Sequence, residues 1–374
     1  MKKILGIVAE YNPMHYGHTY QLNLASGQTG CEYTVIAMSG DFVQRGEPAI
    51  VDKWTRAKMA VAAGADLVAE IPAWFALQSA EGFARAGVRL LQCCGVTHMS
   101  FGSESGDIDE LSQLARWLQK PQTQGDIRSQ LQTGITYAAA VQQAAEESQA
   151  AAHLGHLLRG ANNILAIEYL RALEKTPIIA HTVKRTGQHP NASQIRLLLA
   201  RGGDSEAFSH IPPCVRDIFI EGLKTTGPIF AEDLAQAIFY ALISLGSKGI
   251  SSLPACSEGL ENRLCHALSQ AQSLQGLLEA VKTRRYPYTR IQRLLMQALL
   301  RFDTVKSPEQ VPYLRVLAAS PRGKELLPGL AQSKLPLLYS ARDMRKLDSG
   351  AMALLDLEIH AERVYQMAQR LKGN

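Results

Sequence analysis

The sequence lacks any apolar run long enough to cross a bilayer. Of its 374 residues, 46% are hydrophobic and 20% are charged, but charged and turn residues interrupt the apolar stretches, whereas a membrane-spanning helix needs about 20 consecutive apolar residues. The N-terminal segment MKKILGIVAEYNP reaches an acidic residue and a proline too early for the hydrophobic part of a secretory signal. We therefore expect a cytoplasmic protein with no membrane partner.

Cysteine is scarce, and no two cysteines form a Cys-x-x-Cys pair. This spacing favours neither a disulfide framework nor a structural zinc site, so we expect reduced cysteines, mostly in the core. The net charge of +5 is small and is compatible with a polyanionic partner or with an ordinary basic enzyme. The six cysteines are Cys31, Cys93, Cys94, Cys214, Cys256 and Cys265.

Strand and helix patterns alternate through the first half of the chain. Helical periodicity separates several short apolar segments that are bounded by turn residues, an order that predicts an α/β fold with a Rossmann-like, parallel, doubly wound sheet. The expected helices include residues 52–64 and 79–94. The expected strands are residues 3–10, 33–39, 65–72, 97–103 and 177–185.

The strand signal fades near residue 205, and long segments with helical periodicity follow at residues 231–245, 261–281 and 290–302. A chain of this length favours two domains. We expect a catalytic domain at residues 1–204 and a mainly helical domain at residues 205–374. The Ala- and Gln-rich stretch at 130–153 fits an exposed helix better than a linker.

Two histidines follow the first expected strand in NPMHYGH, residues 12–18. Ligands of open α/β sheets bind beyond the carboxyl ends of the strands, where this loop lies. Pro13 and Gly17 shape a loop that approaches a ligand closely, and a helix expected to start near His18 directs its amides at an anion. His15 and His18 can then donate hydrogen bonds to a phosphate, whose charge grows when a nucleophile attacks the α-phosphorus of a nucleotide.

Two other interpretations of this histidine pair stay open. Zinc binding is one, although no Glu-flanked His-x-x-x-His motif or Cys cluster accompanies the pair, and we expect no metal-ligating residues here. The other is a pair of surface histidines in a Gly/Pro loop, because motifs this short also arise by chance.

A second candidate for phosphate binding is NASQIRLLLA, residues 191–200. We expect Ser193 to cap or open an apolar helix, with Arg196 one turn further. A hydroxyl, backbone amides and a guanidinium at a helix start can bind the β- and γ-phosphates of a triphosphate. An ordinary helix cap with a solvated arginine is the alternative.

Polar groups also gather in SGDFVQRGEPAIVDKWTR, residues 39–56. Asp41 follows the second expected strand, while Lys53 and Arg56 open a helix at a spacing that puts them on one face. A small carboxylate near the α-phosphate needs a cationic clamp, which Asp41 could orient, or Asp41 could accept a proton. A solvated, salt-bridged loop is the alternative, and we assign a catalytic role here only to Asp41.

These segments together resemble one family. The order of the motifs, a strand followed by His-x-Gly-His and, much later, a helix start at Ser193, resembles that of the nucleotidyltransferase superfamily with the HIGH motif. More narrowly, AEYNPMHYGH, SGDFVQRGEPAIVDKWTRAKMA, FGSE, GANNILAIEYLRAL, VKRTGQ and TRRYPYTRIQRLL resemble the tRNA(Met) cytidine acetate ligase family over most of the chain. The resemblance implies an ATP site formed by Ile7, Val8, Ala9, Glu10, Tyr11, Asn12, Pro13, Met14, His15, Tyr16, Gly17, His18, Thr19, Tyr20, Gly102, Asn162 and Arg185.

The residue types at the last three positions agree with this implied site. Gly102 ends the fourth expected strand, where a missing side chain lets adenine or ribose lie against the backbone. Asn162 can both donate to and accept from a nucleotide edge, and Arg185 ends the fifth expected strand at the same edge of the sheet. Asn163 could exchange roles with Asn162. A turn glycine, a helix cap and a solvated arginine are the plain alternatives.

The resemblance implies an ATP-dependent ligase. Acetate attacks the α-phosphorus of ATP to give acetyl-adenylate and pyrophosphate, with Mg²⁺ expected to bridge phosphates. The exocyclic amine of the wobble cytidine of elongator tRNA(Met) then attacks the acetyl carbonyl, and AMP leaves. An adenylyltransferase acting on a phosphorylated cofactor precursor is the alternative enzyme, and a nucleotide-binding regulatory protein without catalysis is a third possibility. The sequence leaves the oligomeric state open.

A basic segment in the second half, KTRRYPYTRIQR at residues 282–293, predicts RNA binding. It combines cations that neutralise phosphates with Tyr286 and Tyr288, on which an unstacked base can stack. A charged, solvated helix entry is the alternative. The expected RNA-binding residues are Arg284, Arg285, Arg290 and Arg293.

Overall fold

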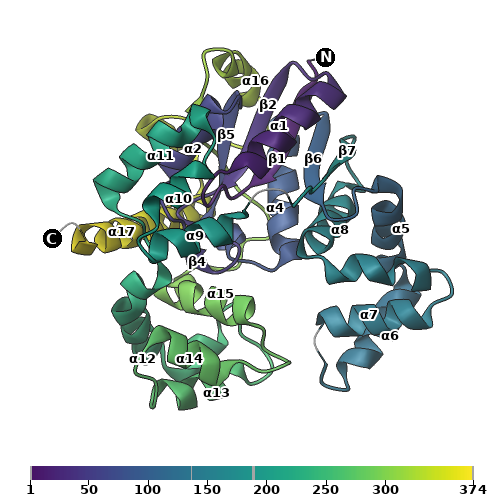
Figure 1. Cartoon of the computed structure of the whole chain (residues 1–374). Coiled ribbons are helices and arrows are strands. Elements are labelled where there is room, and N and C mark those ends of the chain that lie inside the picture. Colours follow the sequence, from purple (N-terminus) through teal and green to yellow (C-terminus); the bar gives the residue numbers. More distant parts are fainter. Residues whose placement is uncertain (1, 136, 188–189, 373–374) are drawn as a thin grey trace.

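A mixed sheet with the strand order β7-β6-β1-β2-β5-β8-β9 organises the chain (Figure 1). The computed structural model describes residues 2–135, 137–187 and 190–372. A separate antiparallel pair, β3 (Phe42–Val43) and β4 (Glu47–Pro48), lies between β2 and α2 in the sequence. The strands of the sheet are β1 (Ile4–Ala9), β2 (Tyr33–Ser39), β5 (Leu67–Ile71), β6 (His98–Ser103), β7 (Ile179–Lys184), β8 (Leu314–Ala319) and β9 (Leu337–Leu338).

The five strands expected in the first half are all present and pair in parallel, which confirms the α/β fold. The last two strands were not predicted. Strand β8 pairs antiparallel with β5 and brings residues of the second half into the same sheet. Strand β9 has only two residues, and β8 lies in the half of the chain where helical periodicity predominates, so neither strand was distinguished by its pattern. The division at residues 204 and 205 stays a prediction.

Helices cover both faces of the sheet because successive residues of each central strand face opposite sides. In β2, Val35 packs into the core that contains α4 and α8, whereas Ile36 packs into the core that contains α1, α2 and α9 to α11. The α-helices are α1 (Tyr16–Thr29), α2 (Lys53–Ala62), α3 (Ala73–Ala76), α4 (Ala80–Cys93), α5 (Ile108–Leu118), α6 (Pro121–Leu131), α7 (Tyr137–Glu147), α8 (Ala161–Leu173), α9 (Ala192–Ala200), α10 (Asp204–Ser209), α11 (Pro213–Thr226), α12 (Ala235–Ser251), α13 (Leu260–Leu268), α14 (Leu274–Val281), α15 (Tyr288–Leu299), α16 (Leu327–Leu330) and α17 (Ser349–Lys372).

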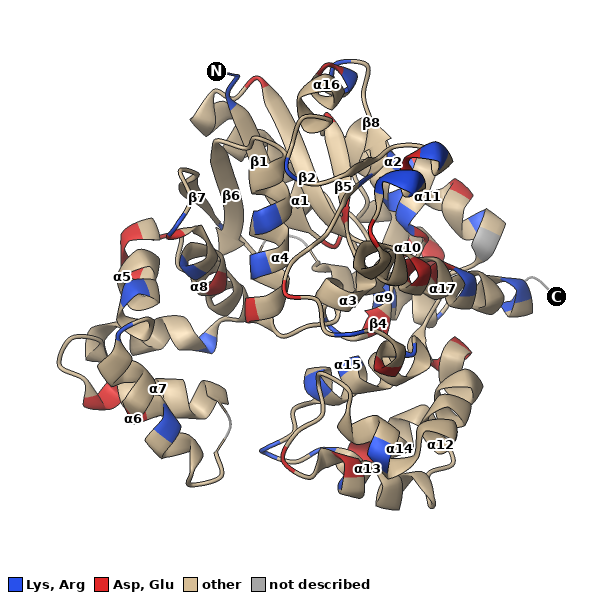
Figure 2. Ribbon diagram, turned by 180° about the vertical axis from the view of Figure 1, so that it is seen from behind, with Lys and Arg blue, Asp and Glu red and all other residues tan. Residues whose placement is uncertain are grey.

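Two groups of helices extend from the same end of the sheet, on opposite sides (Figures 1 and 2). One group contains α5 to α8, and its α7 lies within the Ala- and Gln-rich stretch that was expected to be helical, although Thr136 in that stretch lies outside the described residues. The other group contains α12 to α15. Across the described ranges, no helix combines the length and the apolar composition needed to cross a membrane. Short 3-10 helices are η1 (Ala152–Arg159), η2 (Ala231–Leu234), η3 (Phe302–Thr304), η4 (Gly323–Leu326) and η5 (Ala341–Lys346).

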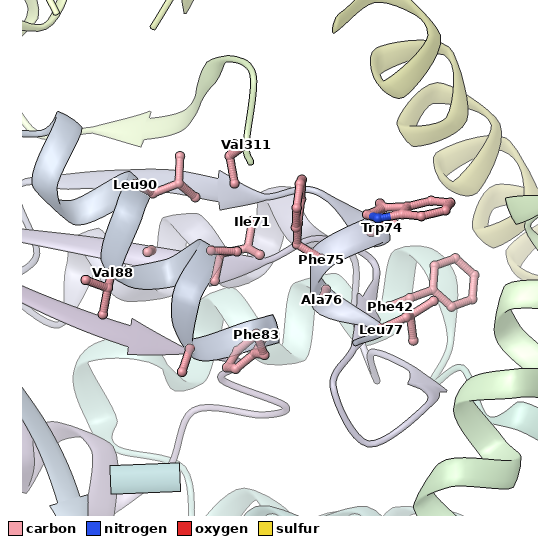
Figure 3. Packing of buried hydrophobic residues seen from close by; sticks show 14 of the residues in the cluster. Phe42, Ile71, Trp74, Phe75, Ala76, Leu77, Phe83, Val88, Leu90 and Val311 are labelled. Atoms are coloured by element: carbon pink, nitrogen blue, oxygen red, sulfur yellow. The ribbon is translucent and has the colours of Figure 1, made fainter. Parts of the chain in front are cut away.

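Aromatic contacts join the end of the sheet to the second half of the chain. Figure 3 shows Phe42, Trp74 and Phe75 among the buried apolar side chains of this region. The Trp74 ring stacks on Phe302 with ring centroids 4.7 Å apart, and Phe42 meets the edge of Tyr365 on α17 at 6.4 Å. Aromatic pairs contribute about 0.5–1.5 kcal/mol beyond the area that they bury, so these contacts help to hold the two halves together.

A buried cluster of charges lies at the ends of β2 and β5. The fully buried Lys53 Nζ is 2.7 Å from Glu70 Oε1, 3.3 Å from Glu358 Oε1 and 3.2 Å from Glu362 Oε2. On β8, Arg315 lies 3.0 Å from Glu70 Oε2. Breaking a buried pair costs about 3–5 kcal/mol because one charge is left without compensation. The cluster therefore ties α17 and β8 to the centre of the sheet.

Two carboxyl groups in this cluster, Glu70 and Glu358, have pKa values that are shifted in opposite directions. Although burial opposes it, Lys53 and Arg315 hold the pKa of Glu70 at about 2. Burial and the Glu70 carboxylate raise the pKa of Glu358 to about 8. Glu358 therefore holds a proton more tightly than an ordinary glutamic acid does, and its Oε2 accepts a hydrogen bond from the Ala73 N–H.

We expect Glu358 to make a contribution to stability that falls as the pH rises from about 5 to about 8. An unfolded Glu358 loses its proton near its ordinary pKa of 4.5, whereas the folded state keeps the proton up to about pH 8. The folded state thus binds more protons between these values, so this contribution is complete below pH 4.5 and is lost toward pH 8. Urea unfolding at successive pH values measures the slope.

The variant Glu358→Gln imitates the protonated acid and should flatten this slope. Its matched control is Asp356→Asn, an exposed carboxylate on the same helix, which should keep the wild-type slope. An unchanged slope in Glu358→Gln would show that the proton resides elsewhere.

Candidate active site

Two histidine side chains close the first turn of α1 reciprocally. His15 is the N-cap, and its Nδ1 accepts a hydrogen bond from the Gly17 N–H at 3.0 Å, while His18 Nδ1 accepts from the His15 N–H at 3.2 Å. The helix begins at Tyr16, earlier than expected, because the imidazole takes the role that Ser or Asp usually has at a cap. A Cβ at residue 17 would lie 2.8 Å from His15 Cε1, so glycine leaves room for the ring.

This arrangement determines which ring nitrogen carries the proton. A neutral imidazole whose Nδ1 accepts a hydrogen bond carries its proton on Nε2, so His15 and His18 each have an Nε2–H donor. Burial, with further contributions from His15 and Arg185, holds the pKa of His18 well below its ordinary value. His18 is therefore a neutral hydrogen-bond donor at physiological pH.

A groove lies between the start of α1 and the carboxyl ends of β6 and β7. Its wall combines the two histidines, the N-terminal amides of α1 and the cations Lys184 and Arg185, which together favour an anion. Gly102 contributes a stretch of bare backbone, where an added Cβ would lie 3.6 Å from Arg185 Cγ. The groove is lined by His15, Gly17, His18, Tyr20, Gln21, Gly102, Val183, Lys184, Arg185, Thr186 and Gly187.

Part of this lining was not predicted. Gln21 lies one helical turn beyond His18, and its Nε2 donates to the Ser100 carbonyl at 3.4 Å. Lys184, Thr186 and Gly187 belong to the VKRTGQ segment, from which only Arg185 was selected. Two signals in the sequence could have identified these residues. Gln21 is three residues after His18, on the same side of the helix, and VKRTGQ lies at the end of an expected strand. Gln188 of the segment lies outside the described residues.

The chain from Ile7 to Met14 was expected to bind ATP, but it lies outside the groove lining, and most of its side chains lie in the core. Ile7, Tyr11 and Met14 are buried there, and Val8 and Ala9 pack against the core clusters. The Asn12–Pro13 peptide bond is cis. Hydrogen bonds to other segments also hold this loop, residues 10–15, in place.

Asn12 and Glu10 link this loop to the segment that follows β2. Asn12 Oδ1 accepts from the Ile50 N–H at 2.7 Å, and Glu10 Oε1 accepts from the Gln44 N–H at 2.8 Å. These bonds fix the loop without using the histidines.

Ser193 and Arg196 lie on the first turns of α9, as expected, and Arg196 contacts the histidine loop. Its Nη1 donates to the Asn12 carbonyl at 2.7 Å, and its Nη2 donates to Ser193 Oγ at 3.3 Å and forms an ion pair with Glu47. The guanidinium is thus close to the loop but already has protein partners. Neither Ser193 nor Arg196 lines the groove described above.

Asp41, Lys53 and Arg56 are buried, so a solvated, salt-bridged loop is excluded for these three residues. Asp41 Oδ1 accepts from the Lys53 N–H at 2.7 Å. Burial raises the pKa of Asp41 to about 6, although Lys53 and Arg56 lower it. Asp41 lies outside the groove lining, and its contacts are those of a residue that fixes the start of α2.

The two asparagines at the start of α8 have different surroundings. Asn163 is buried, and its Oδ1 accepts from the backbone N–H groups of Glu104 and Ser105 at 2.9 and 3.2 Å. Asn162 is half-buried, and its Oδ1 accepts from Arg185 Nη1 at 3.3 Å. Of the two, Asn162 is the one that contacts the wall of the groove.

The four arginines of the basic segment also differ. Arg284 is exposed, and Arg285 forms a surface ion pair with Glu258 at 3.2 Å. Arg290 Nε donates to the Ala255 carbonyl at 3.1 Å, and Arg293 Nη1 donates to the Gln44 carbonyl at 3.4 Å.

Desolvation of Arg293 lowers its pKa to about 10. Tyr286 is buried, whereas Lys282 lies over the Tyr288 ring, 4.5 Å from its centroid. Arg284 and Arg285 are therefore the two arginines of the segment that face solvent.

Comparisons with known proteins agree with the histidine motif and the fold. The model of the HIGH Nucleotidyl Transferase family matches residues 1–374. The tRNA(Met) cytidine acetate ligase of Acetivibrio thermocellus is 36% identical over 98% of this chain and 95% of its own length, and that of Caldanaerobacter subterraneus subsp. tengcongensis is 34% identical over the same shares.

A solved structure is similar along almost the whole chain. The crystal structure of Thermotoga maritima TmcAL bound with alpha-thio ATP superposes with a TM-score of 0.91 at 31% identity, covering 98% of this chain and 95% of that one. Similarity of this extent covers both the sheet and the helical second half. The chain therefore belongs to the tRNA(Met) cytidine acetate ligase family, within the HIGH nucleotidyl transferases.

Proposed function

We propose that the protein is an ATP-dependent tRNA cytidine acetate ligase and that ATP binds in the groove beside α1. The observation that carries this proposal is the reciprocal His15–His18 cap, which gives both rings an Nε2–H donor at a helix N-terminus. Donors fixed before the reaction stabilise charge that develops on phosphoryl oxygens. The names of the relatives favour this ligase over an adenylyltransferase for cofactor precursors.

The nucleoside part of ATP then lies along β6 and β7. Gly102 leaves the backbone open to adenine or ribose, and Arg185, supported by Asn162, flanks it. In the parts of the chain that the structure describes, no three His, Cys, Asp or Glu residues are grouped to hold a metal ion. We propose that Mg²⁺ enters with ATP, because phosphate oxygens are preferred magnesium ligands.

In the first step, an acetate oxygen attacks the α-phosphorus, and the bond to the β-phosphate oxygen breaks. The products are acetyl-adenylate and pyrophosphate. His15 and His18 stabilise the charge on the phosphoryl oxygens, and Arg196 reaches the β- and γ-phosphates if it leaves Glu47. Asp41 is buried outside the groove lining, so in this proposal it orients the acetate site through the start of α2.

In the second step, the exocyclic amine of the wobble cytidine of elongator tRNA(Met) attacks the acetyl carbonyl. The acyl–phosphate bond breaks, AMP leaves, and the amine loses one proton. This amine is a weak nucleophile because its lone pair is delocalised into the ring, so the activated acyl group must be held in register. Since ATP and tRNA are reactants, we propose a cytoplasmic location.

The variant His15→Asn tests the proposed role of the histidines. Asparagine is a good N-cap residue, so α1 should still begin at Tyr16, but the Nε2–H donor is lost. We expect acetate-dependent AMP formation to fall by about 10²–10³-fold, as when an oxyanion donor is removed, with little change in the melting temperature. Rapid-quench measurement of AMP and thermal denaturation provide the two readouts.

The matched comparison for this variant is His15→Ala, which removes both the donor and the cap. It should lose the same activity and, in addition, about 0.5–2 kcal/mol of stability. Wild-type turnover in His15→Asn would refute the assignment of His15 to phosphate chemistry.

We propose that residues 1–204 carry the chemistry and that residues 205–374 bind tRNA, mainly through the basic segment at 282–293. Arg284 and Arg285 face solvent there and can contact phosphates. Arg290 and Arg293 hold the segment against residues 255–258 and against Gln44. In this proposal, the last two arginines act on RNA mostly by shaping the surface.

We expect Arg284→Ala with Arg285→Ala to weaken tRNA binding and to flatten its salt dependence. Each phosphate contact releases counterions from the tRNA when the protein binds. Loss of one contact therefore reduces the steepness of the plot of log binding constant against log salt concentration by about one. Formation of acetyl-adenylate without RNA should persist. Filter binding over a salt series, paired with an RNA-free adenylation assay, measures both.

The control is Lys248→Ala, an exposed cation on α12 outside the segment, which should leave both readouts unchanged. Equal loss of tRNA binding and adenylation in the arginine variant would mean that the segment supports the fold, and the tRNA surface would then lie elsewhere.

A further inference from the structure

A carboxylate next to the groove, Glu104, accepts three hydrogen bonds from the start of α8. Glu104 follows β6 directly, and its Oε1 accepts from the Asn162 N–H at 3.1 Å and from Asn162 Nδ2 at 2.7 Å. Its Oε2 accepts from the Asn163 N–H at 2.6 Å. Anionic acceptors at a helix N-terminus are stabilised by its unpaired N–H groups, and these bonds lower the pKa of Glu104 against the effect of burial.

The contact is reciprocal and closely packed. Asn163 Oδ1 accepts from the backbone N–H of Glu104 at 2.9 Å, so each element bonds the other. A Cβ at Gly160 would lie 2.5 Å from Glu104 Oε2. A glycine at this position therefore leaves the space that the carboxylate occupies, and the loop after β6 is fixed to α8.

The carboxylate also determines how the Asn162 amide is oriented. An ionised carboxylate only accepts hydrogen bonds, so the Asn162 NH₂ group must face Glu104 and its Oδ1 must face away. Oδ1 then accepts from Arg185 Nη1 at 3.3 Å. If the amide were flipped, an oxygen would face the carboxylate and an NH₂ group would face the guanidinium, and both contacts would be repulsive.

We infer that Glu104 is a positioning residue for the nucleotide, acting through Asn162 on Arg185. The hydrogen bonds from Asn162 to Glu104 and from Arg185 to Asn162 fix the Arg185 guanidinium beside Gly102. Arg185 forms part of the wall of the groove there. This inference rests on the proposed function, because it requires that the groove binds ATP. It assigns a role to the glutamate of the FGSE segment.

The variant Glu104→Gln tests this role. The carboxamide has one acceptor oxygen in place of two, and its NH₂ group opposes a donor of either Asn162 or Asn163, so the Asn162 amide is no longer held in a single orientation. We expect the Kd of a non-hydrolysable ATP analogue and the KM for ATP to rise about tenfold while kcat changes little, since the lost contact acts on bound substrate rather than on the transition state. The matched control is Asp107→Asn, which makes the same change in the cap of the neighbouring α5.

A double-mutant cycle shows whether Glu104 acts through Asn162. Asn162→Ala should also weaken binding of the analogue, and adding Glu104→Gln to it should have no further effect. Full additivity of the two changes, or wild-type affinity in Glu104→Gln, would overturn the inference. If Glu104→Gln does not fold, Glu104→Asp, which keeps the charge but shortens the side chain, replaces it with the same expectations.

The outcomes for the proposed function are distinct. Gly102→Val reports on whether ATP occupies the groove at all, because its side chain would fill the space left for adenine or ribose. Normal binding of the analogue in this variant would refute the ATP site itself. Weaker binding in Gly102→Val, together with normal affinity in Asn162→Ala and Glu104→Gln, would refute only the role of Glu104.

Discussion

Two buried cations on α2 hold the carboxyl end of the sheet in place. The Lys53 ammonium lies among the carboxyl groups of Glu70, Glu358 and Glu362. One turn further, the Arg56 guanidinium donates to the carbonyls of Glu10, Ser39 and Gly40. A buried charge is tolerated only while its partners are in position, so the ends of β1, β2 and β5 are constrained together.

The groove depends on this constraint. The loop after β1 leaves the sheet at Glu10, whose carbonyl Arg56 binds, and it reaches the N-cap of α1 at His15. Arg196 holds the same loop from α9 through the Asn12 carbonyl. Because both ends of the loop are fixed, the two imidazoles and the first amides of α1 keep their positions before any ligand arrives, and such preorganised donors need no rearrangement as charge develops.

The second half of the chain completes the first half instead of standing apart from it. Strand β8 pairs with β5, and α17 supplies Glu358 to Lys53. Strand β4 contacts α15, so the proposed RNA-binding segment is linked to the loop that follows β2. The two halves that we propose therefore differ in function but are not structurally independent. A fragment ending at residue 204 would leave Lys53 without its partners Glu358 and Glu362.

The local pattern of the sequence was sufficient for the parallel strands and for the histidine motif. Buried strands such as YTVIAMS are mostly apolar, and a His-x-Gly-His segment that follows a strand of such a sheet lies at its ligand-binding edge. Periodicity did not predict β8 and β9, because β9 has only two residues and β8, which lies between β5 and β9, is specified mainly by the strands with which it pairs.

Only the tertiary structure decided the surroundings of the charged and amide groups. Lys53 is buried because its partners Glu358 and Glu362 come from the far end of the chain, and no local pattern records such a contact. Asn162 and Asn163 are identical in type and adjacent in sequence, yet the Asn162 side chain bonds the side chains of Glu104 and Arg185, whereas the Asn163 side chain accepts from backbone N–H groups. The sequence determined which groups could bind a nucleotide. Long-range hydrogen bonds determined which of these groups face the groove, because burying a polar group is costly unless a neighbour in space pairs with it.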